Sequence, residues 1–327
     1  MKQKKLFYTL LALLFALLLL TVVGCGEDDE VPEVIYHTVS FDTVGGSAVS
    51  PQQVEDGKKA VKPEDPTKEG YVFCGWKNGV LDHAFDSHAI RQSMILRAVW
   101  LPVENAFLYE KIQGTETVRL TGLRSEVTVD MLMLPSVIKG FSVTEVAEGA
   151  FANLSTERIR GITIPDSIKK IGKRAFADCV DIPFVMQGSF REIGEEAFSG
   201  CNALSEIDLA DGMESLPYRA FFGCASLRAV ILPDSVRVIS ENAFENCGLV
   251  YVVLPARLER IEDSAFDGCR LKNVFSKGDG APVAGIIGSK NEALEQANLY
   301  FYSEVDTEIG TWYFDAKGVP QVRSSAQ

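Results

Sequence analysis

The chain has 327 residues, of which 46% are hydrophobic and 24% charged, so its composition is that of an ordinary globular protein that can bury a core. Its 32 Lys and Arg against 45 Asp and Glu leave a net charge of -13, which provides no basic surface for a phosphate backbone and predicts no nucleic acid partner. Length alone would suggest roughly two domains of about 150 residues, but internal repeats have to be sought before that estimate is used.

Residues 1–24 have the layout of an export signal. Three lysines within the first five residues precede an uncharged apolar run over residues 6–23, an order typical of a secretory signal, although the run approaches the length of a membrane-spanning helix. Residues 22–25, Val-Val-Gly-Cys, resemble the lipobox of bacterial lipoproteins, in which the cysteine thiol accepts a diacylglycerol. The resemblance implies that Cys25 is the lipidation site and the first residue of a mature chain held to a membrane by its lipid chains.

Residues 25–32 form an acidic linker. The run Gly-Glu-Asp-Asp-Glu over residues 26–30 repels itself and stays solvated, so it predicts a spacer that lifts the folded part off the membrane. It also resembles the acidic signal that sends some lipoproteins of Gram-negative bacteria to the outer face of the outer membrane. We therefore expect a lipid-anchored protein at the cell surface.

Residues 33–101 predict a small β-rich domain. Polarity alternates over residues 36–42 before a glycine pair, which indicates a strand entering a turn, and residues 71–76 and 94–100 are typical of two further strands. The order resembles the internalin B-repeat, or Listeria–Bacteroides repeat, through Phe41, Gly45-Gly46, Pro63, Pro66, Gly70-Tyr71, Gly75-Trp76 and Ala98-Val99-Trp100. The resemblance implies a β-grasp-like module that acts as a spacer or a binding unit and not as an enzyme.

All three histidines, His37, His83 and His88, lie in this domain. The His-x4-His spacing of the last two could supply two metal ligands, but a metal site needs further Cys, His or carboxylate partners, and no such cluster accompanies them. We therefore expect surface or turn histidines, no metal and no other cofactor. Cys74 is expected to be a small core residue.

From residue 131 to residue 276 one phrase recurs, clearest over residues 232–247 as Leu-Pro-Asp-Ser-Val-Arg-Val-Ile-Ser-Glu-Asn-Ala-Phe-Glu-Asn-Cys. Successive copies are roughly 23 residues apart, a period typical of leucine-rich repeats, whose units bury their apolar sides by stacking. The phenylalanines of the phrase, which we expect to form a single row, are Phe151, Phe176, Phe198, Phe221, Phe244 and Phe266.

Each unit is predicted to contain one short strand. In the unit around residue 230, Val230 and Leu232 are two residues apart and face the core, Pro233 ends the strand, and Ala243-Phe244 packs against it from a short helical turn. The phrase resembles the BspA-type leucine-rich repeat of bacterial surface antigens. That family is mostly associated with adhesion, so the resemblance implies a non-catalytic scaffold for binding.

Cysteines stand three residues after the later phenylalanines. Neighbours at equivalent positions of stacked strands lie roughly 4.8 Å apart, a distance that a disulfide could just span. Because the side chains run parallel and their number is odd, we favour reduced thiols that fill the core, with disulfides as the alternative in an exported protein. The residues are Cys179, Cys201, Cys224, Cys247 and Cys269.

Both flanks of the repeats are predicted to be caps, which solenoid ends require. Residues 102–130 form the N-terminal cap, with a hairpin over residues 106–109 and 117–121, and residues 277–327 form the C-terminal cap, with aromatic strands over residues 298–302 and 311–315. The expected fold class is therefore an α+β repeat protein: a leucine-rich-repeat solenoid preceded by a small β-grasp-like domain.

The strand register predicts which residues face outward. One outward column is Met133, Thr163, Val185, Asp208, Ile231, Val253 and Phe275, and the other is Met131, Gly161, Pro183, Glu206, Ala229, Tyr251 and Asn273. Within them an apolar cluster is the candidate binding site, because exposed apolar and aromatic residues often mark contacts. Its members are Ile231, Tyr251, Val253 and Phe275. Alternatively, the C-terminal segment covers the cluster, or these residues only serve strand propensity.

No catalytic residue is assigned. Carboxylates such as Asp166 and Asp234 occupy turn positions, and the sequence has no His-containing triad, zinc-protease motif, Gly-rich phosphate loop or nucleophile elbow. The predicted function is that of a non-catalytic cell-surface lipoprotein that presents its repeats to an extracellular protein or glycan. The alternatives are an accessory scaffold of a nutrient-uptake complex and an extracellular enzyme that acts on glycan or peptide.

Overall fold

The computed structural model describes residues 34–79, 81–83, 85, 87–125, 127–278, 286–303 and 311–323. The predicted signal peptide, the lipidation site Cys25 and the acidic linker lie outside these described residues. By its contacts the chain divides into two units, Met1–Tyr36 and His37–Gln327. Within the described ranges, no helix is both long enough and apolar enough to cross a membrane.

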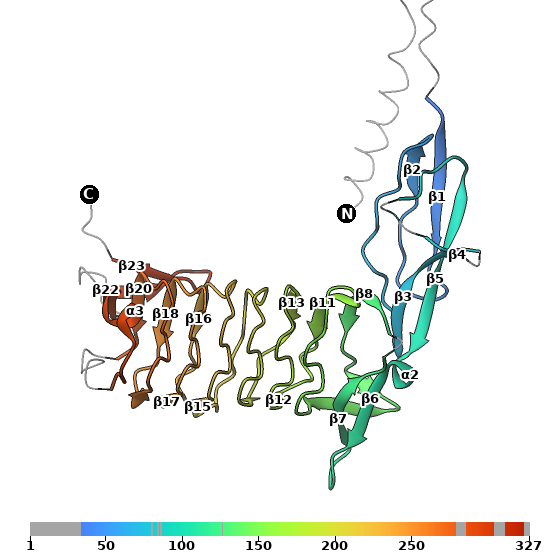
Figure 1. The fold of residues 1–327 in the computed structure, drawn as a ribbon. Coiled ribbons are helices and arrows are strands. Elements are labelled where there is room, and N and C mark those ends of the chain that lie inside the picture. The colour runs from blue at the N-terminus through green and yellow to red at the C-terminus, as the bar shows by residue number, and fades with distance from the viewer. Residues whose placement is uncertain are drawn as a thin grey trace, which may run out of the picture. The chain divides into compact units, whose positions relative to one another are not determined.

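The N-terminal domain is a five-stranded sheet in the order β2-β1-β5-β3-β4 (Figure 1). Strands β1 and β5 run parallel, and β3 runs antiparallel to β5. The strands are β1 (Tyr36–Asp42), β2 (Gln52–Glu55), β3 (Tyr71–Asn78), β4 (Leu81–Asp82) and β5 (Met94–Pro102). Leu96 and Ala98 of β5 share a buried core with Trp76 of β3. No helix occurs in the described part of this sheet, so the β-grasp-like description stays a prediction.

The repeats form a solenoid with two ladders of parallel strands, which run across Figure 1. Most turns contribute one short strand to each ladder, but residues 201–210 contribute only an isolated bridge, and each ladder divides into two hydrogen-bonded sheets. The first ladder contains β8 (Val129–Met133), β11 (Ile159–Ile164), β13 (Phe184–Met186), β16 (Ala229–Ile231), β18 (Tyr251–Leu254) and β20 (Asn273–Ser276). The second contains β10 (Phe141–Val146), β12 (Lys170–Ile171), β14 (Glu192–Ile193), β15 (Ser215–Leu216), β17 (Val238–Ile239) and β19 (Arg260–Ile261).

The corner that carries each phenylalanine is a tight turn and not the short helix expected at Ala243-Phe244. Residues two before and two after the phenylalanine have positive φ, as in Asn242 and Asn246, both at 58°. Left-handed residues at this spacing end a right-handed helix before it completes a turn. The described helices are α2 (Val103–Ala106) and α3 (Glu292–Glu295), of 4 residues each. The described chain is therefore mainly β with very little helix, and the α+β class stays a prediction.

The phenylalanines of the repeat form one continuous row, as predicted. Five successive pairs stack nearly parallel, with ring centroids separated by 5.5, 5.4, 5.8, 5.3 and 5.3 Å from Phe151 to Phe266. All six side chains are at most 1% exposed. Each ring therefore fills the gap behind the next turn, which is how stacking supplies the burial that a single repeat lacks.

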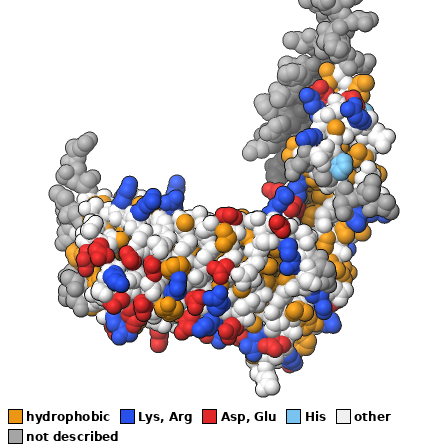
Figure 2. Space-filling model, in the orientation of Figure 1, with side chains coloured by type: hydrophobic (Ala, Val, Ile, Leu, Met, Phe, Trp, Pro, Cys, Tyr) orange, Lys and Arg blue, Asp and Glu red, His pale blue; other side chains and the backbone are white. Residues whose placement is uncertain are grey.

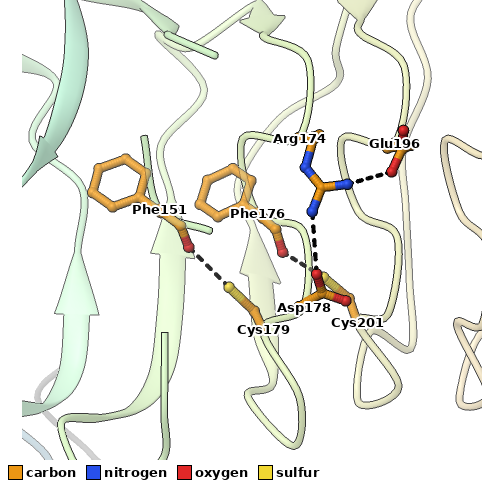
Figure 3. Close-up of polar contacts among 7 residues, drawn as sticks. All are labelled: Phe151, Arg174, Phe176, Asp178, Cys179, Glu196 and Cys201. Atoms are coloured by element: carbon orange, nitrogen blue, oxygen red, sulfur yellow. Dashed lines mark hydrogen bonds and ion pairs between the residues drawn. The ribbon is translucent and has the colours of Figure 1, made fainter. Parts of the chain in front are cut away.

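The cysteines add a ladder of hydrogen bonds beside this row. The Cys179 thiol donates to the Phe151 carbonyl at 3.0 Å, and the Cys201 thiol donates to the Phe176 carbonyl at 3.1 Å (Figure 3). The contact recurs one turn further each time through Cys224, Cys247 and Cys269, at 3.3, 2.9 and 3.1 Å. All are free thiols, and burial raises the pKa of Cys224 and Cys269. The thiols thus fill the core as predicted, and they also satisfy backbone carbonyls.

The N-terminal end of the solenoid is closed by the predicted hairpin. Strands β6 (Phe107–Lys111) and β7 (Thr117–Leu123) pair antiparallel, and β7 pairs parallel with β10, so the second ladder continues into the cap. Phe107 is 1% exposed and meets Phe151 edge to face at 6.4 Å. This aromatic contact covers the first ring of the row.

The C-terminal end of the row is closed by Asn291, a buried polar residue that is 1% exposed. Within the row, the Phe244 amide donates to the Ala265 carbonyl of the following turn at 2.8 Å. The Phe266 amide instead donates to the side-chain oxygen of Asn291 at 2.9 Å, and the Asn291 amide nitrogen donates to the Glu262 carbonyl at 3.0 Å. Asn291 therefore replaces the backbone of a missing turn, a role that the sequence analysis did not find.

Candidate binding surface

The first ladder has the strand register that the sequence predicted. Ile231 pairs with Val253, and Val253 pairs with Phe275, while the N-terminal strands align Met133, Thr163 and Val185. Along β16 the side chain of Val230 is 2% exposed and that of Ile231 is 41% exposed. The assignment of inward and outward residues on this strand is therefore confirmed.

The predicted apolar cluster is not an exposed cluster, and this part of the prediction is corrected. Val253 is 0% exposed and Phe275 is 3% exposed, because both pack beneath Trp312. The Trp312 ring lies 5.4 Å from Phe275, and its indole nitrogen donates to the Ser276 carbonyl at 2.9 Å. The covering strands, which extend the sheet from β20, are β21 (Asn298–Tyr302), β22 (Thr311–Phe314) and β23 (Pro320–Val322).

Two of the four predicted residues remain at the surface. Ile231 is exposed, and Tyr251 is half-buried with its ring 5.9 Å from that of Phe275. Burial raises the pKa of the Tyr251 phenol, so the hydroxyl is protonated at neutral pH. The alternative, that the C-terminal segment covers the cluster, is therefore correct for Val253 and Phe275. It is not correct for Ile231, which stays exposed.

The outward residues that stay at least partly exposed define what we call the exposed sheet face: Met131, Met133, Pro183, Val185, Glu206, Asp208, Ala229 and Ile231. Gly161 and Thr163, which the sequence placed in the same two columns, are buried. Three of its aliphatic side chains are well exposed, with Met133 at 38%, Val185 at 48% and Ile231 at 41%. Only Glu206 and Asp208 carry a charge. Apolar surface that persists in the folded chain is typical of contact sites.

The second ladder and the corners present the opposite character. Lys170 pairs with Glu192 at 2.7 Å and Arg260 with Glu262 at 2.7 Å, and Figure 2 shows acidic and basic side chains crowded along the edge where β12, β15 and β17 lie. At one corner Arg174 joins two turns through Glu196 and Asp178 (Figure 3). Exposed pairs of this kind contribute little stability and mark a solvated surface. The exposed sheet face differs from this surface because its residues form no such ion pairs within the described part of the chain.

The three histidines of the N-terminal domain contact one another or a carboxylate. His83 and His88 stack with ring centroids 5.1 Å apart, and His37 bonds Asp56 at 2.8 Å. Burial first, and the neighbouring His88 second, lower the pKa of His83. Over the described part of the chain, no three His, Cys, Asp or Glu side chains are grouped so that they could hold a metal ion.

Comparisons with known proteins identify two repeat families. Residues 139–273 match the BspA type leucine rich repeat region in six copies, and residues 37–99 match the Listeria-Bacteroides repeat domain. A leucine rich repeat protein of T. pallidum is 28% identical, with a TM-score of 0.48 over 57% of this chain and 85% of that one. A leucine rich cell surface protein of Faecalibacterium prausnitzii is 22% identical, with a TM-score of 0.44 over 67% of this chain and 59% of that one.

Among curated proteins, two from Evansella cellulosilytica that are provisionally named as membrane proteins share short segments with the chain. One is 39% identical over 71 residues and the other 34% identical over 87 residues, which is 21% and 26% of this chain. The chain spans only 11% and 10% of the length of these relatives. By the family matches, residues 37–99 of the chain are a Listeria-Bacteroides repeat domain and residues 139–273 are a BspA-type leucine-rich repeat region.

Proposed function

We propose that the protein is a non-catalytic binding protein of the cell surface and that the exposed sheet face contacts its extracellular protein or glycan ligand. The observation that carries the proposal is the contrast between this face and the rest of the solenoid. The eight residues of this face include two carboxylates and no Lys or Arg, whereas ion pairs between lysine or arginine and glutamate lie along the second ladder. The match to a repeat family of surface proteins supports the same role.

We further propose that Cys25 carries the lipid anchor and that the acidic linker directs the protein to the outer face of a Gram-negative outer membrane. The support is the lipobox-like sequence over residues 22–25 and the acidic run that follows it. In cells grown with an alkyne-labelled fatty acid, the full chain should incorporate the label and the Cys25→Ala variant should not. Equal labelling of the two chains would rule out Cys25 as the anchor.

A charge placed on the exposed sheet face tests the binding role. The Val185→Glu variant should bind at least about tenfold more weakly, or about 1.4 kcal/mol, because a carboxylate would be desolvated in an apolar contact. Val180→Glu is the matched control, because Val180 is 47% exposed and Val185 is 48% exposed, and Val180 lies off the face.

The measurement is binding of both variants and the unaltered chain to arrays of extracellular matrix proteins and glycans, with affinities determined for each ligand found. Circular dichroism checks that both variants are folded. A Val185→Glu variant that binds as tightly as the unaltered chain would place the ligand elsewhere on the protein.

A further inference from the structure

A cavity of about 280 Å³ lies beside the N-terminal sheet, and we call it the Trp76 pocket. Its aromatic walls are Phe73 and Trp76 of β3 together with Phe85. Thr128 and the first two residues of β8, Val129 and Asp130, close another side. The pocket is separate from the exposed sheet face, since the two share no residue.

Three buried polar atoms around this pocket lack a hydrogen bond within the described residues: Trp76 Nε1, His83 Nε2 and Asp65 Oδ1. Asp65 Oδ1 is ion-paired with Lys62 Nζ at 3.1 Å, so Trp76 Nε1 and His83 Nε2 are the two atoms of this group that have no polar partner in the described part of the chain. Folded proteins rarely leave buried polar atoms unpaired, because such an atom loses its hydrogen bonds to water and gains none in return. Two such atoms, Trp76 Nε1 and His83 Nε2, at one cavity are what a ligand with hydrogen-bonding groups would satisfy.

The other two tryptophans of the chain show that the unpaired indole is local to this pocket. Trp100 Nε1 donates to the Thr43 carbonyl at 2.8 Å, and Trp312 Nε1 donates to the Ser276 carbonyl at 2.9 Å. Trp76 is 3% exposed, so its N–H cannot turn to bulk water instead. A ligand in the pocket could supply the acceptor that this donor lacks among the described residues.

The charges at the pocket cancel, which argues against an ionic ligand. Lys62 pairs with both Asp65 and Asp130, and Arg160 lies 3.6 Å from Asp130. Two cations and two carboxylates leave no net charge to attract an anion or a cation. Because its pKa is lowered, His83 is neutral at neutral pH and its Nε2 can either donate or accept.

The walls require a ligand that is apolar on its faces and polar at its edge. Trp76 packs edge to face with Phe73 at 5.3 Å, and Phe85 packs against His83 at 4.7 Å, so aromatic surface surrounds the polar atoms. A sugar ring has this character, because its C–H faces pack on aromatic rings and its hydroxyls both donate and accept. The volume is just below the roughly 300–1,000 Å³ of ordinary ligand pockets, which suits one ring.

We propose that the Trp76 pocket binds one neutral pyranose ring, such as the terminal sugar of a glycan. A ring hydroxyl oxygen accepts from Trp76 Nε1, a hydroxyl donates to Asp65 Oδ1, and another hydroxyl bonds His83 Nε2. The indole and imidazole nitrogens then gain the partners that they lack, and Asp65 gains a second partner, from a ligand that brings no charge. The proposal does not depend on the exposed sheet face, so Val185→Glu should leave this binding unchanged.

The test is titration of the full chain with the methyl glycosides of glucose, galactose, mannose and N-acetylglucosamine, followed by saturation-transfer NMR and calorimetry. We expect at least one glycoside to bind, and Trp76→Phe to weaken it at least tenfold, because phenylalanine keeps the aromatic wall and removes the N–H. Trp100→Phe is the matched control, which removes an indole outside the pocket and should change the affinity less than twofold.

Three outcomes would overturn the proposal. If no glycoside binds the unaltered chain, the pocket holds water only. If Trp76→Phe binds as tightly as the unaltered chain, the sugar lies elsewhere. If Trp100→Phe loses as much affinity as Trp76→Phe, the loss does not come from a hydrogen bond between Trp76 Nε1 and the sugar. Asp65→Ala serves as a second variant, and it too should weaken binding, because it removes both oxygens that could accept the ligand's hydroxyl.

Discussion

Replacing Phe221 by alanine is expected to lower the free energy of unfolding by about 3–5 kcal/mol, among the largest effects of any single substitution in the solenoid. The Phe221 ring is fully buried and lies 5.8 Å from that of Phe198 and 5.3 Å from that of Phe244. Because each turn contacts only its neighbours, the cavity would also weaken the coupling between the two halves of the stack. We expect the single unfolding transition in urea to broaden or to divide in two.

The adjacent residue provides the control for this experiment. Phe222 is only partly buried, and its ring lies 3.7 Å beneath the Arg219 guanidinium at the corner. Phe222→Ala should therefore cost less than about 1.5 kcal/mol and keep the shape of the transition, because it loses a surface contact and leaves no internal cavity. Hydrogen exchange measured turn by turn locates the loss. Equal destabilisation by the two variants would mean that the row of rings does not hold the turns together.

Replacing Trp312 by alanine should cost about 3–5 kcal/mol and confine the damage to the C-terminal cap. The indole ring is 0% exposed, contacts Phe275 and Phe314 at 5.4 and 4.9 Å, and donates one hydrogen bond to Ser276. Its removal would uncover Val253 and Phe275. We therefore expect the variant to bind an apolar dye such as ANS and to exchange the amides of β20, β21 and β22 faster.

Tyr313 is the matched control for the cap, because it follows Trp312 on the same strand and is 38% exposed. Tyr313→Ala should change stability by less than about 1 kcal/mol and leave dye binding as it is. Should Trp312→Ala prove as stable as Tyr313→Ala and bind no dye, the cover over Val253 and Phe275 would not depend on the indole. The expected difference in stability and dye binding between the two variants thus tests directly whether Trp312 covers Val253 and Phe275.

The repeat architecture could be predicted from the sequence because periodicity is a local property. The spacing of Phe151 through Phe266 required equivalent turns, and equivalent turns have to stack to bury their apolar sides. Once Val230 and Leu232 were assigned to the core, the alternation of a strand fixed Ile231 on the outside, and parallel pairing carried that register to the neighbouring strands. The hairpin of the N-terminal cap could likewise be predicted from alternation within a short segment.

Contacts between distant segments could not be predicted in this way. Trp312 covers Phe275, which lies 37 residues earlier in the chain. No sequence pattern within either segment specifies that contact. The same holds for Asn291, which completes the hydrogen bonds of Phe266, and for the thiols that donate to carbonyls of the preceding turn. The sequence by itself determined that this protein is a stack of leucine-rich repeats behind a small β domain, because repetition dictates stacking. Only the tertiary structure decided which outward residues stay exposed and which polar atoms of the N-terminal domain are left unpaired. Both depend on how segments that are distant in the sequence pack against one another.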